Sequence, residues 1–138
     1  MFPSLPKSEQ GNVYGIPGYI ARLMRSADER AFLTISIARS DDFLQMTGDG
    51  RGVQIDFPMI TTRQRSFEEK IRGIALRQGL AVVENLGSDG ARFLDVDVEG
   101  SPRAVAAVCS KILREVYNVS GDAELIFQHA GLAPGNAA

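Results

Sequence analysis

Alternation of apolar and polar residues marks three strands in the first half of the chain, at 31–38, 43–47 and 53–57. Successive side chains of a strand point to opposite faces of its sheet, so this alternation predicts one buried and one exposed face. Pro58 should end the third strand, because proline cannot donate a ladder hydrogen bond. The apolar residues predicted to face inward are Leu33, Ile35, Ile37, Val53, Ile55 and Phe57.

Apolar residues spaced three or four apart predict three helices. They cover 19–27, 66–78 and 101–117. Ser66 stands three residues before Glu69, which is the spacing of a capping box at a helix start. We therefore expect the second helix to begin at Ser66.

Two further strands, 80–86 and 92–98, flank the turn sequence GSDG and predict a hairpin. Residues 123–127 fit either a last short strand or a helical turn. The resulting order is α-β-β-β-α-β-β-α. It predicts an α+β fold, with one mostly antiparallel sheet of about five strands and helices packed on a single face.

The length of 138 residues predicts one ordinary domain, and 44% hydrophobic residues are enough to form a core. Residues 1–12 contain two prolines and read as a flexible N-terminal arm. Residues 132–138 read as a flexible tail. The predicted domain therefore spans 13–131.

A net charge of −2 argues against a general affinity for nucleic acid or for anionic membranes, which needs a basic surface. No run approaches the roughly 20 apolar residues of a membrane span. The N-terminus has no apolar core of signal-peptide length. With a single cysteine, no internal disulfide is possible. We expect a cytoplasmic protein without membrane contact.

The segment GDGRG at 48–52 raises the question of a phosphate-binding loop. Such loops lead from a strand into a helix, whose N-terminus meets the phosphate, and a P-loop also needs a Lys followed by Ser or Thr. Here a strand follows. The glycines therefore indicate a hairpin turn, with Arg51 left as a residue able to contact a partner.

Three carboxylates, Asp95, Asp97 and Glu99, fall on one face of the strand 92–98 and its end. Neighbouring members lie about 7 Å apart on an extended strand, which is too far for one metal ion without other ligands. We interpret them as a solvated outer face. The stripe is also able to attract a basic segment of a partner.

His129 is the only histidine and Cys109 lies in the apolar stripe of a predicted helix. A metal site or a catalytic triad needs further groups that the sequence does not place beside them. We predict packing roles for both residues, and no cofactor, metal or catalytic residue.

The helix region 63–77 holds the one basic cluster of the chain, and it raises nucleic-acid binding as an alternative function. RNA-binding sheets interleave aromatic and basic residues on an open face. The predicted sheet offers Phe32, Phe43 and Phe93, but among uncharged or acidic neighbours. We expect this helix face to be solvated instead.

The order of elements over residues 15–118, together with the hairpin FLQMTGDGRGVQIDF, resembles the type III secretion chaperone-like fold, which includes YbjN-like proteins. The resemblance implies a homodimer that binds segments of other proteins without catalysis. The mild charge and the extension DAELIFQHAGL depart from that family's pattern. No functional residue carries over, because the family has no signature motif.

The sequence therefore predicts a non-catalytic protein-binding module, chaperone-like or adaptor-like. A sheet with one layer of helices leaves a face free to dimerise or to receive a peptide. The alternative is a small-ligand or enzymatic domain with a pocket between sheet and helices. The residues predicted to contact the partner are Phe32, Phe43, Arg51, Phe93, Asp95 and Asp97.

Overall fold

The computed structural model describes residues 5–135 and confirms an α+β fold with an antiparallel sheet. The strands are β1 (Lys7–Gly11), β2 (Phe32–Ile37), β3 (Phe43–Gly48), β4 (Gly52–Pro58), β5 (Val82–Leu86), β6 (Arg92–Glu99) and β7 (Leu125–Ala130). The helices are the 3-10 turn η1 (Val13–Gly15), α1 (Ile16–Met24), α2 (Thr62–Ser66), α3 (Glu68–Gln78) and α4 (Pro102–Glu115). The described residues thus form seven strands where the sequence predicts about five.

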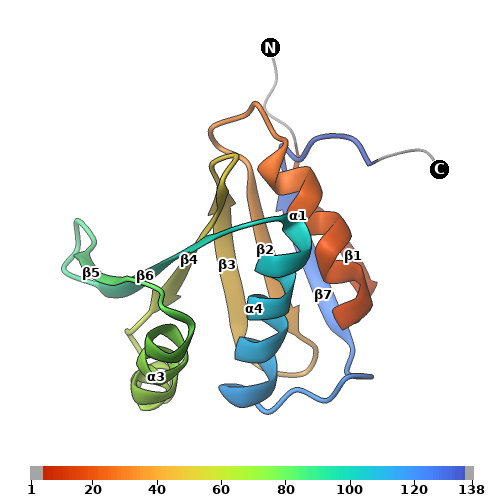
Figure 1. The fold of residues 1–138 in the computed structure, drawn as a ribbon. Coiled ribbons are helices and arrows are strands. Elements are labelled where there is room, and N and C mark those ends of the chain that lie inside the picture. The colour runs from red at the N-terminus through yellow and green to blue at the C-terminus, as the bar shows by residue number, and fades with distance from the viewer. Residues whose placement is uncertain (1–4, 136–138) are drawn as a thin grey trace.

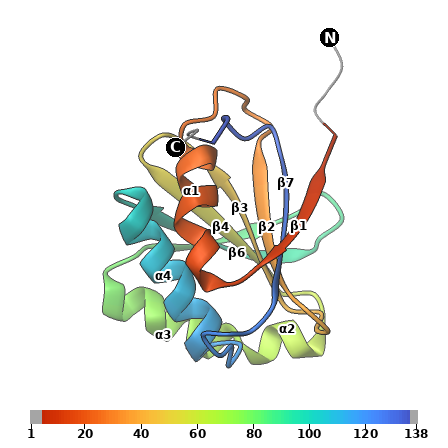
Figure 2. The same cartoon turned by 90° about the vertical axis from the view of Figure 1, so that its right-hand side faces the viewer.

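The sheet has the order β1-β7-β2-β3-β4-β6-β5, and each neighbouring pair is antiparallel. Helices α1, α3 and α4 lie on one side of it, while α2 lies at one end (Figure 1, Figure 2). The core fills the space between these two layers. Of the residues predicted to face inward, all are buried except Ile37, which is half-buried.

Helix α1 begins earlier than its predicted start at residue 19. Pro17 lies in its first turn, where a proline's missing N–H costs nothing. Ile16, Ile20 and Leu23 form its buried stripe. Its last turn also contacts the segment that follows β7, because Arg22 Nε donates to the carbonyl of Ala133 at 2.9 Å.

The predicted capping box at Ser66 is wrong. The box is formed one helix earlier, where the Thr61 hydroxyl accepts from Gln64 N and the Gln64 side chain accepts from Thr61 N. Ser66 ends α2 and donates to the carbonyl of Arg63. The pairs Thr61–Gln64 and Ser66–Glu69 both have the spacing of a capping box. Only the first pair forms one, and α3 begins after Phe67 without a side-chain cap.

Strands β1 and β7 extend the sheet beyond the predicted five strands. Residues 7–11 belong to the segment read as a loose arm, but they pair with β7. Residues 125–130 form β7, which decides between the two readings of 123–127 in favour of a strand. Residues 1–4 and 136–138, also expected to be flexible, lie outside the described residues.

Buried His129 anchors the edge strand β1. Its Nε2 lies 2.6 Å from Glu9 Oε1, and the Tyr19 hydroxyl donates to the same oxygen at 3.0 Å. The hydrogen bond with His129, followed by that from Tyr19, lowers the pKa of Glu9. Tyr19 also stacks on Phe127, with ring centroids 4.3 Å apart. A polar edge strand is therefore held by contacts on the helix side.

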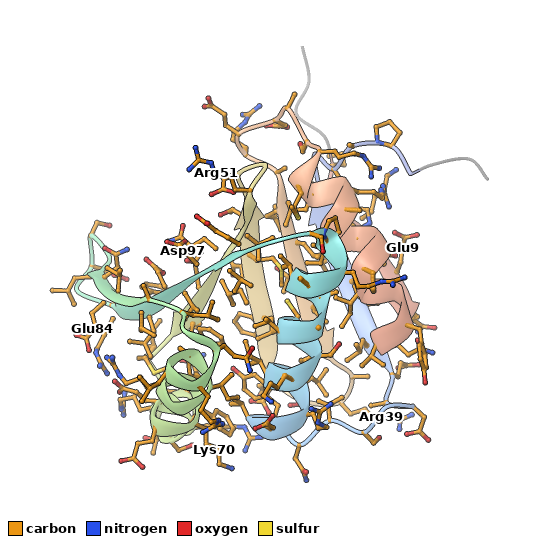
Figure 3. The ribbon with its side chains drawn as sticks, in the orientation of Figure 1. Glu9, Arg39, Arg51, Lys70, Glu84 and Asp97 are labelled. Carbon is orange, nitrogen blue, oxygen red and sulfur yellow. The ribbon has the colours of Figure 1, made fainter. Side chains whose placement is uncertain are left out.

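The glycine segment 48–52 is the turn of the β3–β4 hairpin, as predicted. Asp49 Oδ1 accepts from the backbone N–H groups of Arg51 and Gly52 at 2.9 and 3.0 Å. Gly50 has a φ of +84°, a conformation that favours glycine. Arg51 is exposed at the tip of this hairpin (Figure 3).

Candidate functional site

The face of the sheet opposite α1, α3 and α4, here called the open face, carries the second set of alternating side chains. Residues paired directly across antiparallel strands share a face, so the register identifies its members. In strands β2, β3, β4, β6 and β5 they are Phe32, Thr34, Ser36, Phe43, Gln45, Thr47, Gln54, Asp56, Pro58, Phe93, Asp95, Asp97, Glu99, Val83 and Asn85.

An apolar row crosses the open face at one end of its strands, where β3 and β6 begin and β4 ends. Pro58 on β4 is paired with Phe93 on β6. The register of β3 with β4 places Phe43 beside Pro58 in the same row. All three side chains are half-buried, so part of each ring faces outward. Half-exposed rings in one row are typical of a surface that binds another molecule.

A polar row runs beside the apolar one and contains two apposed carboxylates. Asp56 on β4 is paired with Asp95 on β6, and Gln45 on β3 is paired with Asp56. Asp95 is 7% exposed, and Asn85 Nδ2 donates to its Oδ2. Within residues 5–135, no N–H or hydroxyl group of another residue donates to the Asp56 carboxylate. These two residues are called the Asp56–Asp95 pair below.

The carboxyl group of Asp56 holds its proton up to near neutral pH. Burial, the hydrogen bond with Asp95 and the negative charges of Asp95 and Asp97 raise the pKa of Asp56 to about 7. Two carboxylates on neighbouring strands repel each other when both are ionised, and a proton between them relieves that repulsion. Asp56 is therefore a residue whose protonation state changes near physiological pH.

A pocket of about 360 Å³ opens beside this pair. Its walls come from the four neighbouring strands β3, β4, β6 and β5, and from the turn after β5. A volume of this size is at the small end of the about 300–1,000 Å³ range for ligand pockets. The lining residues are Gln45, Asp56, Pro58, Asn85, Leu86, Gly87, Phe93 and Asp95.

The open face is acidic, and no strand position on it is lysine or arginine within residues 5–135. The arginine on the same strands, Arg92, points to the helix side. There it donates to Glu68 at 2.7 and 2.6 Å and also to Glu84, while Arg72 donates to both glutamates. These bonds, led by Arg92, lower the pKa of Glu68 to about 2. No ion pair within residues 5–135 involves Asp56, Asp95, Asp97 or Glu99.

The structure brings together some of the residues predicted to contact a partner and separates others. Phe93 and Asp95 line the pocket, and Phe43 lies in its apolar row. Asp97 is exposed on the same face (Figure 3). Phe32 and Arg51 do not line this pocket. Whether any of these residues binds a partner stays a prediction.

Asp56, Asn85 and Gln45 are members of the pocket that the sequence did not single out. The alternation of VQIDF indicated that Asp56 points outward, but it carried no sign of what lies opposite. The pairing of β4 with β6 joins residues about 40 positions apart in the chain, and it arises only in the folded sheet.

The residues considered for metal or nucleophilic chemistry lie inside the fold. His129 is buried and bonded to Glu9, and burial raises the pKa of the Cys109 thiol to about 12. Within residues 5–135, no three His, Cys, Asp or Glu side chains are grouped to hold a metal ion. None of the helices in this part of the chain has the length and apolar character needed to cross a membrane.

Comparison of the chain with models of protein families, with curated proteins and with solved structures finds no match. The resemblance to secretion chaperones therefore stays a prediction. The expected homodimer, protein partner and cytoplasmic location stay predictions as well.

Proposed function

We propose that this domain is a non-catalytic protein-binding module, chaperone-like or adaptor-like, which receives a segment of a partner protein on its open face. The observation that carries the proposal is the composition of that face. An apolar row of Phe43, Pro58 and Phe93 lies beside uncompensated carboxylates, on strands that no described helix covers. Half-exposed aromatic groups supply apolar contact area, and polar neighbours fix orientation.

An extended segment suits this face better than a helix does. Side chains on a sheet form rows at a regular spacing, and an extended peptide presents every second side chain toward them. The pocket beside Phe93 would then take one side chain of the segment. Its small volume supports a single side chain as occupant.

The Phe43→Asp variant is expected to lose partner binding while staying folded, because Phe43 is half-buried on the open face and not in the core. The measurement is quantitative mass spectrometry of proteins retained from lysate by the tagged chain. The matched control is Leu76→Asp, which places the same charge on α3 at a side chain that is 82% exposed.

We expect wild type and Leu76→Asp to retain the same protein, and Phe43→Asp to retain at least about tenfold less of it. Circular dichroism and the melting temperature establish that each variant is folded. Equal retention by all three proteins would show that the open face is not the binding surface.

A further inference from the structure

We propose that the partner segment is basic, and that one of its arginine side chains enters the pocket between Phe93 and the Asp56–Asp95 pair. This inference rests on the proposed function and specifies the chemistry of the partner. It follows from the charge of the open face, the walls of the pocket and the acceptor capacity of its two carboxylates.

The charge of the open face calls for a cationic partner. Four carboxylates project from its strands, and no lysine or arginine on the described strands shares the face. Complementary charge steers association and excludes acidic competitors. The four are Asp56, Asp95, Asp97 and Glu99.

The pocket walls favour a flat, apolar-faced cation. Phe93 and Pro58 provide apolar sides, while Asp56 and Asp95 supply carboxylate oxygens. A guanidinium group stacks on an aromatic ring and donates two parallel hydrogen bonds to a carboxylate. A lysine ammonium is compact and strongly hydrated, and it gains less from both contacts. Arginine is therefore the side chain that this pocket should select.

The acids of the pocket also keep acceptor capacity for a ligand. Asp95 receives one N–H from Asn85 and is more than nine-tenths buried. Asp56 receives none from residues 5–135. Asp56 is half-buried, so its oxygens are open to a ligand at the pocket. An arginine fork supplies hydrogen-bond donors together with a positive charge.

Binding of arginine should release the proton of Asp56. The titratable groups that face Asp56 are Asp95 and Asp97 on β6, whereas β3 and β5 offer Gln45 and Asn85, which do not titrate. A guanidinium that replaces the proton requires Asp56 to be ionised. Affinity should then rise about tenfold from pH 6 to pH 8, the range in which that carboxyl group ionises.

The test uses labelled extended peptides in which valine alternates with arginine, lysine or citrulline. Citrulline has the shape of arginine without its charge. Fluorescence anisotropy at constant ionic strength gives Kd for the full chain at pH 6 and pH 8. The variants are Asp56→Asn and Phe93→Leu, with Glu29→Gln as the control, because Glu29 is an exposed acid outside the sheet.

We expect the arginine peptide to bind at least about tenfold more tightly than the citrulline peptide, and more tightly than the lysine peptide. Asp56→Asn should weaken arginine binding about tenfold at pH 8 and remove its dependence on pH. Phe93→Leu should reduce the preference for arginine over lysine. Glu29→Gln should bind like wild type.

Three results would overturn the inference. Equal affinity for arginine and citrulline peptides would exclude recognition of the cation. Equal effects of Asp56→Asn and Glu29→Gln would place binding outside the pocket. Free arginine competing as strongly as the peptide would indicate a small-molecule site.

The lysate experiment distinguishes a failure of the arginine inference from a failure of the proposed function. If the arginine peptide fails while retention of a partner still depends on Phe43, the proposed partner chemistry is wrong and protein binding stands. If retention does not depend on Phe43 either, both proposals fall.

Discussion

Replacement of Asp56 by asparagine is expected to stabilise the folded chain by about 2 kcal/mol at pH 8. Burial and the neighbouring carboxylates raise the pKa of Asp56 from its usual 3.8 to about 7. A shift of about three units corresponds to about 4 kcal/mol without screening, and partial solvent exposure of this carboxyl group reduces it. An amide at position 56 has no charge to bury and can donate to Asp95.

The stabilisation of the Asp56→Asn variant relative to the wild type should increase as the pH rises. A carboxyl group whose pKa is higher in the folded chain binds its proton more tightly there than in the unfolded chain. The contribution of Asp56 to the stability of the wild type therefore falls as the pH rises from about 4 to about 7, and the Asp56→Asn variant lacks that loss.

Urea denaturation at pH 4 and pH 8 measures this effect as the difference in free energy of unfolding between the wild type and Asp56→Asn. That difference should grow by about 2 kcal/mol over the interval. Groups with a lowered pKa, such as Glu68, are present in both proteins and cancel. Glu29→Gln controls for the loss of one negative charge and should leave stability unchanged. A wild type more stable than Asp56→Asn at pH 8 would contradict the raised pKa of Asp56.

A pair that lowers stability supports a binding role for the open face. Like charges directly opposite each other on neighbouring strands are unfavourable. Local conflicts of this kind are typical of functional sites, where ligand contacts compensate for them. The proposed arginine would remove the conflict in the Asp56–Asp95 pair when the partner binds.

The second large effect is expected at Gly52, where alanine should destabilise the fold by about 3 kcal/mol. A Cβ atom there would lie 1.9 Å from the carbonyl oxygen of Val98 and 2.8 Å from the Cα atom of Glu99. Both are backbone atoms of the paired strand β6, and neither can move without disturbing the pairing that places Asp56 beside Asp95.

Two other glycines serve as controls for Gly52→Ala in thermal or urea unfolding. Gly50 has a positive φ and open space around it, so alanine should cost about 1 kcal/mol through backbone strain alone. Gly121 has neither constraint, and alanine there should be nearly neutral. A Gly52→Ala variant as stable as Gly121→Ala would contradict the close approach of β4 and β6.

The sequence predicts the local elements of this fold well, because one buried sheet face produces strong alternation. The strand around Ile55 and the hairpin at Gly50 follow directly from that pattern. The strand at Lys7–Gly11 does not, since it is polar and depends on pairing with β7 and on the contact of Glu9 with His129.

The candidate site could be predicted only in part, for a related reason. Side-chain parity placed Phe43, Phe93 and Asp95 on one face, which the structure confirms. The Asp56–Asp95 pair depends on which strands become neighbours and in which register. That information lies in long-range packing and not in the local periodicity of either strand.

Site-specific photo-crosslinking in cells tests most directly whether the open face binds a partner segment. A photoreactive phenylalanine analogue would replace Gln45, which is exposed on the open face beside the pocket, or Leu76, which is exposed on α3. The proposed function predicts one strong partner adduct from position 45 and none from position 76. An adduct from position 76 with none from position 45 would contradict it.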